Sequence, residues 1–71
     1  MSTSLNWEST YAIAIALRRL YPKVSMESVT LSQIYTWTIN LPGFEDDPSL
    51  CNDDILNAIF QDWYEETIHE R

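Results

Sequence analysis

The pattern of apolar and polar residues predicts a first helix over residues 8–21. Four apolar residues recur at spacings of three and four, as on the core-facing side of an α-helix: Ile13, Ala16, Leu17 and Leu20. Pro22 ends the pattern, because proline lacks the backbone N–H that a helix interior needs. Trp7 precedes the helix and is placed to pack back over its first turn. The candidates for the N-cap are Asn6, Glu8 and Ser9.

A second helix is predicted over residues 31–41, after a mostly polar connector at residues 23–30. The stretch is rich in β-branched and aromatic residues, which favour a strand. Its apolar residues nevertheless recur at three, three and four instead of alternating: Leu31, Ile34, Trp37 and Leu41. Thr30 and Gln33 have the spacing of a capping box, with Ser32 as an alternative N-cap. The periodicity and the cap together favour a short helix.

A third helix is predicted from residue 53 to about residue 68. The preceding residues 42–52 hold two of the three prolines and the single glycine, so they should form a loop, with Phe44 as its anchor in the core. Asn52 is the expected N-cap, and two aspartates follow it where the positive end of the helix dipole favours them. The inward-facing residues should be Ile55, Leu56, Ile59, Phe60 and Trp63.

These elements predict one all-α domain, a compact bundle of three to four helices. With 71 residues and 45% apolar content, the chain can form one small core. Trp7, Trp37 and Trp63 each align with the apolar stripe of their segment and should contribute to this core. The ends of the chain, residues 1–5 and 68–71, should be frayed.

Charge is segregated along the chain. The net charge is −7, from eleven acidic and four basic residues. Arg18, Arg19 and Lys23 lie close together, and residues 24–70 hold ten carboxylates with no Lys or Arg. Such a surface repels phosphate backbones and anionic membranes, which disfavours nucleic-acid and membrane binding. A basic protein surface or a cation is the natural partner; the alternative is that the acids only keep a small protein soluble.

Glu45, Asp46 and Asp47 form the first candidate site. We expect these loop carboxylates chiefly to dock a basic partner. Two of the three could also converge on a hard cation such as Fe²⁺, Mg²⁺ or Ca²⁺, in an exposed and therefore weak metal site. A third interpretation is a solvated loop in which one aspartate caps a turn.

Asp62, Glu65 and Glu66 form a second candidate site near the end of the last helix. Their spacing gathers an acidic face there, which could dock the same basic partner. Acids near a helix C-terminus are locally unfavourable, because the helix dipole prefers cations at that end. Their presence therefore favours a role in binding.

Tyr11 and Ile15 form a third candidate site on the first helix. They lie four residues apart and roughly opposite the core-facing stripe, so the helix carries apolar groups on two sides. Such a patch indicates contact with a partner or with a second copy of the chain. Alternatively, Ile15 is covered by the N-terminal tail or by residues around Val24.

No catalytic site is predicted. The chain has one His, one Cys and one Gly, too few for a nucleophile with its base or for a glycine-rich phosphate loop. Its longest apolar run, residues 12–17, is six residues, against the roughly 20 that span a membrane. The lone thiol of Cys51 and an N-terminus without a basic, apolar run argue against secretion. We expect a non-enzymatic, cytoplasmic protein with no tightly bound cofactor.

Several residues occur in an order that resembles a known family. In chain order they are Trp7, Tyr21-Pro22, Trp37, the run Phe44-Glu45-Asp46-Asp47-Pro48, Asn52, Ile55-Leu56, Ala58-Ile59 and Trp63. This order resembles the IscX family, small acidic proteins of bacterial iron–sulfur cluster assembly, without gaps from about residue 5 to residue 66. The resemblance implies a single IscX-like domain over residues 1–71, with an all-helical fold akin to a winged helix.

The resemblance also implies a partner. Family members look like adaptors that dock an acidic face on the basic surface of the pyridoxal-phosphate cysteine desulfurase, compete there with ferredoxin and bacterial frataxin, and bind iron weakly. The chain departs from the family on the first helix, at positions where the family commonly has acids; this chain has Ser9, Ala12, Ile15 and Arg19 there. The loop and the last helix keep their charge.

Three hypotheses for the function follow. The first is an acidic adaptor or regulator that docks on a cysteine desulfurase and binds Fe²⁺ weakly. The second is an iron-binding metallochaperone or sensor. The third is an acidic mimic of nucleic acid that inhibits a basic protein.

Overall fold

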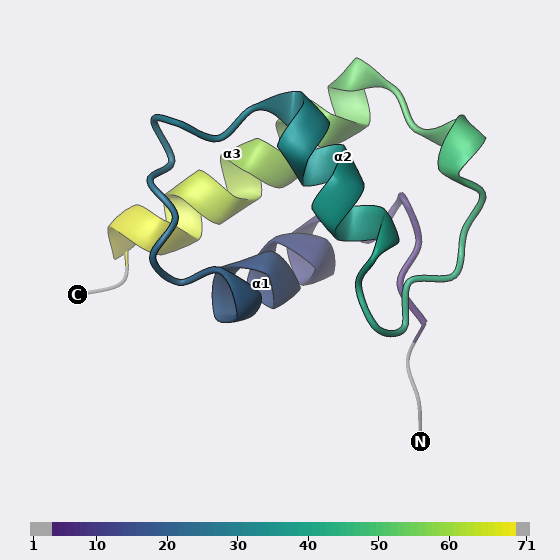
Figure 1. Ribbon diagram of the computed structural model, residues 1–71, viewed down its shortest axis with the longest axis horizontal. Coiled ribbons are helices and arrows are strands. Elements are labelled where there is room, and N and C mark those ends of the chain that lie inside the picture. The colour runs from purple at the N-terminus through teal and green to yellow at the C-terminus, as the bar shows by residue number, and fades with distance from the viewer. Residues whose placement is uncertain (1–3, 70–71) are drawn as a thin grey trace.

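A computed structural model describes residues 4–69 and shows an all-helical protein. Its helices are α1 (Thr10–Leu20), α2 (Leu31–Ile39), the short 3₁₀ helix η1 (Pro48–Leu50) and α3 (Asp53–His69). α1 and α3 pack side by side, and α2 lies across them, with a long loop on either side of the molecule (Figure 1). Within these residues β pairing is limited to one isolated bridge, between Leu5 and Phe44. The all-α expectation, with three to four helices, is confirmed.

α1 is shorter than its periodicity suggested. Ser9, one of the three predicted N-caps, occupies the cap position, but its side chain makes no capping hydrogen bond. Its hydroxyl donates to Asn6 Oδ1, which also accepts from the Glu8 N–H at 2.9 Å. Its buried residues are Ile13, Ala14 and Leu17. Leu20, predicted to face the core, is 53% exposed. It is the last residue of the helix and lines a surface groove instead.

α2 begins with the predicted capping box. The Thr30 hydroxyl accepts from the Gln33 N–H at 3.1 Å, and the Gln33 side chain accepts from the Thr30 N–H at 2.9 Å. The helix ends two residues before the predicted end, yet Leu41 in the following turn is buried. The helical interpretation of this β-rich sequence is confirmed, because local capping and burial of one face outweigh strand propensity.

α3 also begins as predicted. Asn52 Oδ1 accepts from the Ile55 N–H at 2.9 Å, which is the geometry of an N-cap. Leu56, Ile59 and Trp63 are buried, whereas Ile55 and Phe60 lie at the edge of the core and are only partly buried. No helix within residues 4–69 is both long and apolar enough to span a membrane.

Aromatic contacts join the segments around the core. Trp7 stacks on Tyr35, with ring centroids 6.1 Å apart, and meets the edge of Phe44 at 4.8 Å. Trp37 stacks on Tyr21 at 4.4 Å and meets Trp63 at 6.1 Å. The three tryptophans therefore contribute to the core as predicted, although Trp37 is only partly buried.

The N-terminal segment is fastened to the loop after α2. The Leu5 N–H donates to the Gly43 carbonyl, and the Glu45 N–H donates to the Leu5 carbonyl, both at 2.8 Å. Gly43 has a φ of 88°, which favours glycine and turns the loop toward this contact. Leu5 was expected to be frayed, but these two hydrogen bonds hold it in place, and α3 continues to His69. The remaining expectation for residues 1–3 and 70–71 lies outside the described residues.

We expect the substitution Thr38→Val to stabilise the protein. Thr38 is fully buried, and its hydroxyl has no hydrogen-bond partner among the described residues. Removing an unsatisfied buried hydroxyl should raise the free energy of unfolding by about 1 kcal/mol, and the melting temperature by roughly 4–8 °C. Thermal denaturation followed by circular dichroism measures the change. The control is Thr36→Val on the exposed side of the same helix, and an unchanged or lower melting temperature for Thr38→Val would contradict the expectation.

Candidate functional site

Asp46 ties the acidic loop to the start of the chain. Its Oδ2 accepts from the Trp7 backbone N–H at 3.0 Å, and its Oδ1 accepts from the Asp47 N–H at 2.7 Å. The first bond spans 39 residues of sequence. The carboxylate is half-buried and charged hydrogen bonds of this kind are strong, so Asp46 has a structural role as well as a charge.

Asp47 caps η1. Its Oδ1 accepts from the Ser49 N–H at 3.0 Å and from the Ser49 hydroxyl at 2.9 Å. The Ser49 backbone N–H, followed by its hydroxyl, holds the pKa of Asp47 below its usual value. The backbone carbonyl of Asp47 accepts from the Trp7 indole N–H at 2.8 Å. Asp47 therefore stays ionised at neutral pH while serving as the turn cap that the sequence allowed.

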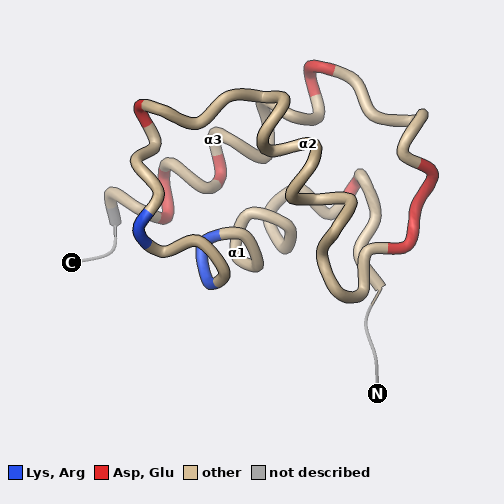
Figure 2. Tube along the Cα trace, in the orientation of Figure 1, with Lys and Arg blue, Asp and Glu red and all other residues tan. Residues whose placement is uncertain are grey.

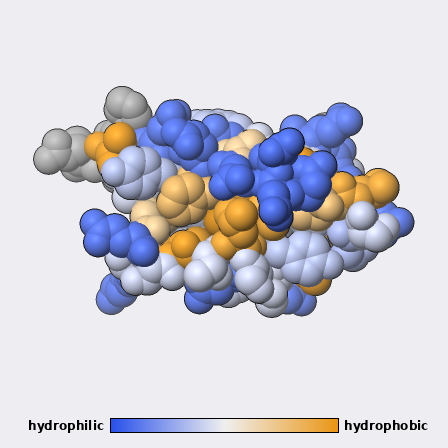
Figure 3. All heavy atoms as spheres, turned by 90° about the horizontal axis from the view of Figure 1, so that it is seen from above, coloured by the Kyte–Doolittle hydropathy of each residue, from blue (hydrophilic) through white to orange (hydrophobic). Residues whose placement is uncertain are grey.

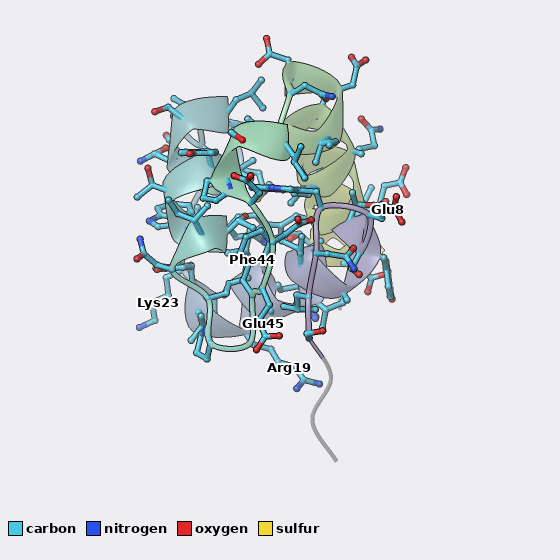
Figure 4. All side chains as sticks on the ribbon, turned by 90° about the vertical axis from the view of Figure 1, so that its right-hand side faces the viewer. Glu8, Arg19, Lys23, Phe44 and Glu45 are labelled. Carbon is cyan, nitrogen blue, oxygen red and sulfur yellow. The ribbon has the colours of Figure 1, made fainter. Side chains whose placement is uncertain are left out.

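Glu45 differs from its two neighbours. Its side chain is exposed and makes no hydrogen bond to another described residue. In Figure 4, Glu45 extends toward the lower side of the molecule. Asp46 and Asp47 instead accept hydrogen bonds from backbone N–H groups.

The acids of α3 contact the first turn of α1. Asp62 Oδ2 accepts from the Thr10 hydroxyl at 3.2 Å, and Glu66 Oε2 accepts from the Tyr11 hydroxyl at 3.1 Å. The bond to Glu66, together with its negative charge, raises the pKa of Tyr11. Glu65 is exposed next to them. The α3 acids thus flank the beginning of α1.

Both predicted acidic sites bond residues at the start of α1. Trp7 bonds Asp46 of the loop, and Thr10, three residues later, bonds Asp62 of α3. Glu8 lies between these two residues in sequence and adds a further exposed carboxylate. Negative charge around a helix N-terminus is favoured by the helix dipole. We define the acidic surface as Glu8, Asp46, Asp47, Asp62, Glu65 and Glu66. Sequence reasoning missed Glu8, whose signal was its place in a predicted helix start.

The basic residues gather at the end of α1. Arg18, Arg19 and Lys23 lie there beside the C-terminal half of α3, whereas the loop acids lie on the other side of the molecule (Figure 2). Cations in the last turn of a helix also complement its dipole. The basic residues are therefore remote from the loop acids but adjoin the part of α3 that carries Glu66.

The Tyr11 and Ile15 patch divides between two surfaces. Tyr11 is 55% exposed and bonds Glu66 at the acidic surface. Ile15 is half-buried and lines a groove with Leu5 and Leu20. The groove was not foreseen, although Ala12, Ile15, Ala16 and Arg19 have the spacing of one helix face. Apolar side chains also reach the surface between hydrophilic ones on the face shown in Figure 3.

Comparison with known proteins places this geometry in a family. The family model described as iron-sulphur cluster assembly matches residues 5–68. A Pseudomonas aeruginosa protein described as uncharacterized protein PA3808 is 36% identical over 63 residues, covering 89% of this chain and 96% of that protein. The chain belongs to the IscX family. It is therefore one of the small accessory proteins involved in iron–sulfur cluster assembly, a family that is not a known class of enzymes.

The metal site expected from the IscX resemblance stays a prediction. Within residues 4–69, no three His, Cys, Asp or Glu side chains are grouped so that they could hold a metal ion. Asp46 and Asp47 accept hydrogen bonds from backbone N–H groups.

Cys51 has no feature of a reactive thiol. It is half-buried just before α3, and burial, followed by the charge of Asp53, raises its pKa. A reactive cysteine needs a lowered pKa, since the thiolate is the nucleophile. This agrees with a spectator thiol next to the N-cap.

Proposed function

We propose that this protein is a non-catalytic adaptor that docks its acidic surface on the basic surface of a cysteine desulfurase and thereby regulates iron–sulfur cluster assembly. The observation that carries the proposal is that loop and α3 acids are both held by hydrogen bonds from residues at the start of α1. Ferredoxin and a frataxin-like protein would compete for the same basic surface. Membership in a cluster-assembly family supports this choice over a mimic of nucleic acid.

The hydrogen bonds of the acidic surface suit it to docking. Asp46 and Asp47 are held by backbone N–H donors, and Asp62 and Glu66 by hydroxyl donors. A side chain that is already fixed loses less conformational entropy when a partner binds it. Carboxylates held in this way can select a partner whose cations match their arrangement.

Isothermal titration of this protein into the cysteine desulfurase from the same source tests the proposal. We expect saturable binding at about 0.05 M salt, and a dissociation constant at least about tenfold higher at roughly 0.3 M salt, because salt screens exposed charges. Absence of binding at the lower salt concentration would refute desulfurase docking. Binding that is insensitive to salt would refute the role of the acidic surface.

A further inference from the structure

A groove of about 400 Å³ lies along α1, apart from the acidic surface. α1 contributes Ala12, Ile15, Ala16 and Leu20, and the opposite wall includes Leu5 and Leu41. The loop after α2 turns back beside the N-terminal segment (Figure 1), to which Gly43 and Glu45 are hydrogen-bonded through Leu5. Leu20 is 53% exposed at this groove, so apolar surface is left in contact with water.

The groove has opposite charges toward its two ends. Arg19, in the last turn of α1, lines it at one end. Glu45 lies toward the other end. Its backbone N–H donates to the carbonyl of Leu5, and Leu5 belongs to the N-terminal segment, which lies toward the start of α1 (Figure 1). Figure 4 shows the side chains of Arg19 and Glu45 extending to the same side of the molecule.

Neither of these charges has an ion-pair partner within residues 4–69. A basic partner on the groove would place a positive charge against Arg19, and an acidic partner would place a negative charge against Glu45. A second copy turned by a twofold rotation presents an acid to Arg19 and a base to Glu45. The apolar middle of the groove is matched in the same arrangement.

We propose that this groove is a twofold contact between two copies of the chain. Ile15 and Leu20 of each copy pack against those of the other, and Arg19 of each copy faces Glu45 of the other. The net charge of −7 on each copy opposes association over long range. Added salt screens this repulsion, so the self-association should strengthen with salt, opposite to the expected docking on a desulfurase.

Sedimentation equilibrium of the isolated chain tests the contact. We expect the mass to rise from 8.3 kDa toward twice that value with increasing concentration, and more steeply at about 0.5 M than at about 0.05 M salt. Ile15→Asp should remove the association over the whole range. Arg19→Glu and Glu45→Arg should each raise the dissociation constant about tenfold, because each creates two like-charge contacts. The double variant, Arg19→Glu with Glu45→Arg, should restore it.

Two control variants change the same charges away from the groove. Lys23→Glu and Glu27→Arg alter exposed side chains that do not line it, and should leave the dissociation constant within about twofold. A monomer at every concentration and salt would overturn the proposal. Association that survives Ile15→Asp, or that the double charge exchange fails to restore, would overturn it as well.

Discussion

Trp7→Ala is expected to leave little folded protein at 25 °C. Trp7 is 2% exposed, its backbone and indole N–H groups bond Asp46 and Asp47, and its ring contacts Tyr35 and Phe44. Truncating a buried tryptophan to alanine costs about 3–5 kcal/mol. A domain of this size has a total stability of roughly 3–5 kcal/mol. Circular dichroism should show loss of the cooperative thermal transition, or a large fall in melting temperature.

A matched control separates the ring from its hydrogen bond. Trp7→Phe keeps an aromatic ring against Tyr35 and Phe44 but removes the indole donor to the Asp47 carbonyl. The free energy of unfolding should fall by about 1–2 kcal/mol more than the smaller ring alone would cause, since the Asp47 carbonyl loses its hydrogen-bond donor. A Trp7→Ala protein as stable as Leu50→Ala, which truncates a 61% exposed side chain, would contradict the central role of Trp7.

The helices could be predicted because their signals are local. The Thr30–Gln33 capping box and the Asn52 cap each act within three residues, and both form as expected. The end of α1 could not be predicted so well. Leu20 continues the apolar repeat of its helix, but whether that position is covered depends on segments distant in sequence, and here it opens onto a groove.

The acidic surface depended on contacts that no local pattern reveals. Asp46 meets Trp7 across 39 residues, and Asp62 meets Thr10 across 52. The composition showed that acids were abundant, and their clustering in sequence indicated two sites. Only the structure shows that both sites bond residues at the start of α1, and that Asp46 and Asp47 also hold the loop.

These structural roles decide which acids can test docking. Reversing the charge of Asp46 or Asp47 would remove the acceptors for Trp7 and Ser49, so a loss of binding could reflect a changed loop. Glu65 has no such role, and Glu66 bonds only the exposed Tyr11 hydroxyl, a bond that contributes little. The pair can therefore be changed with little effect on folding.

The double variant Glu65→Lys, Glu66→Lys should weaken binding to the cysteine desulfurase about a hundredfold or more. Each reversal replaces an attraction to a basic surface with a repulsion, and close interfacial charge pairs couple by about 1.5 kcal/mol or more. The net charge changes from −7 to −3, because each reversal adds two positive charges. Titration calorimetry at low salt measures the loss.

The control makes the same change in net charge outside the acidic surface. Glu27→Lys with Asp54→Lys also gives −3, at exposed positions in the connector and the first turn of α3. The second substitution costs roughly 0.3–1 kcal/mol of stability through the helix dipole, which thermal denaturation would reveal. Long-range attraction that depends on total charge would affect both variants alike. Equal losses of affinity would therefore mean that binding to the desulfurase depends only on net charge. A loss confined to Glu65 and Glu66 would instead identify the α3 side of the acidic surface as the docking contact.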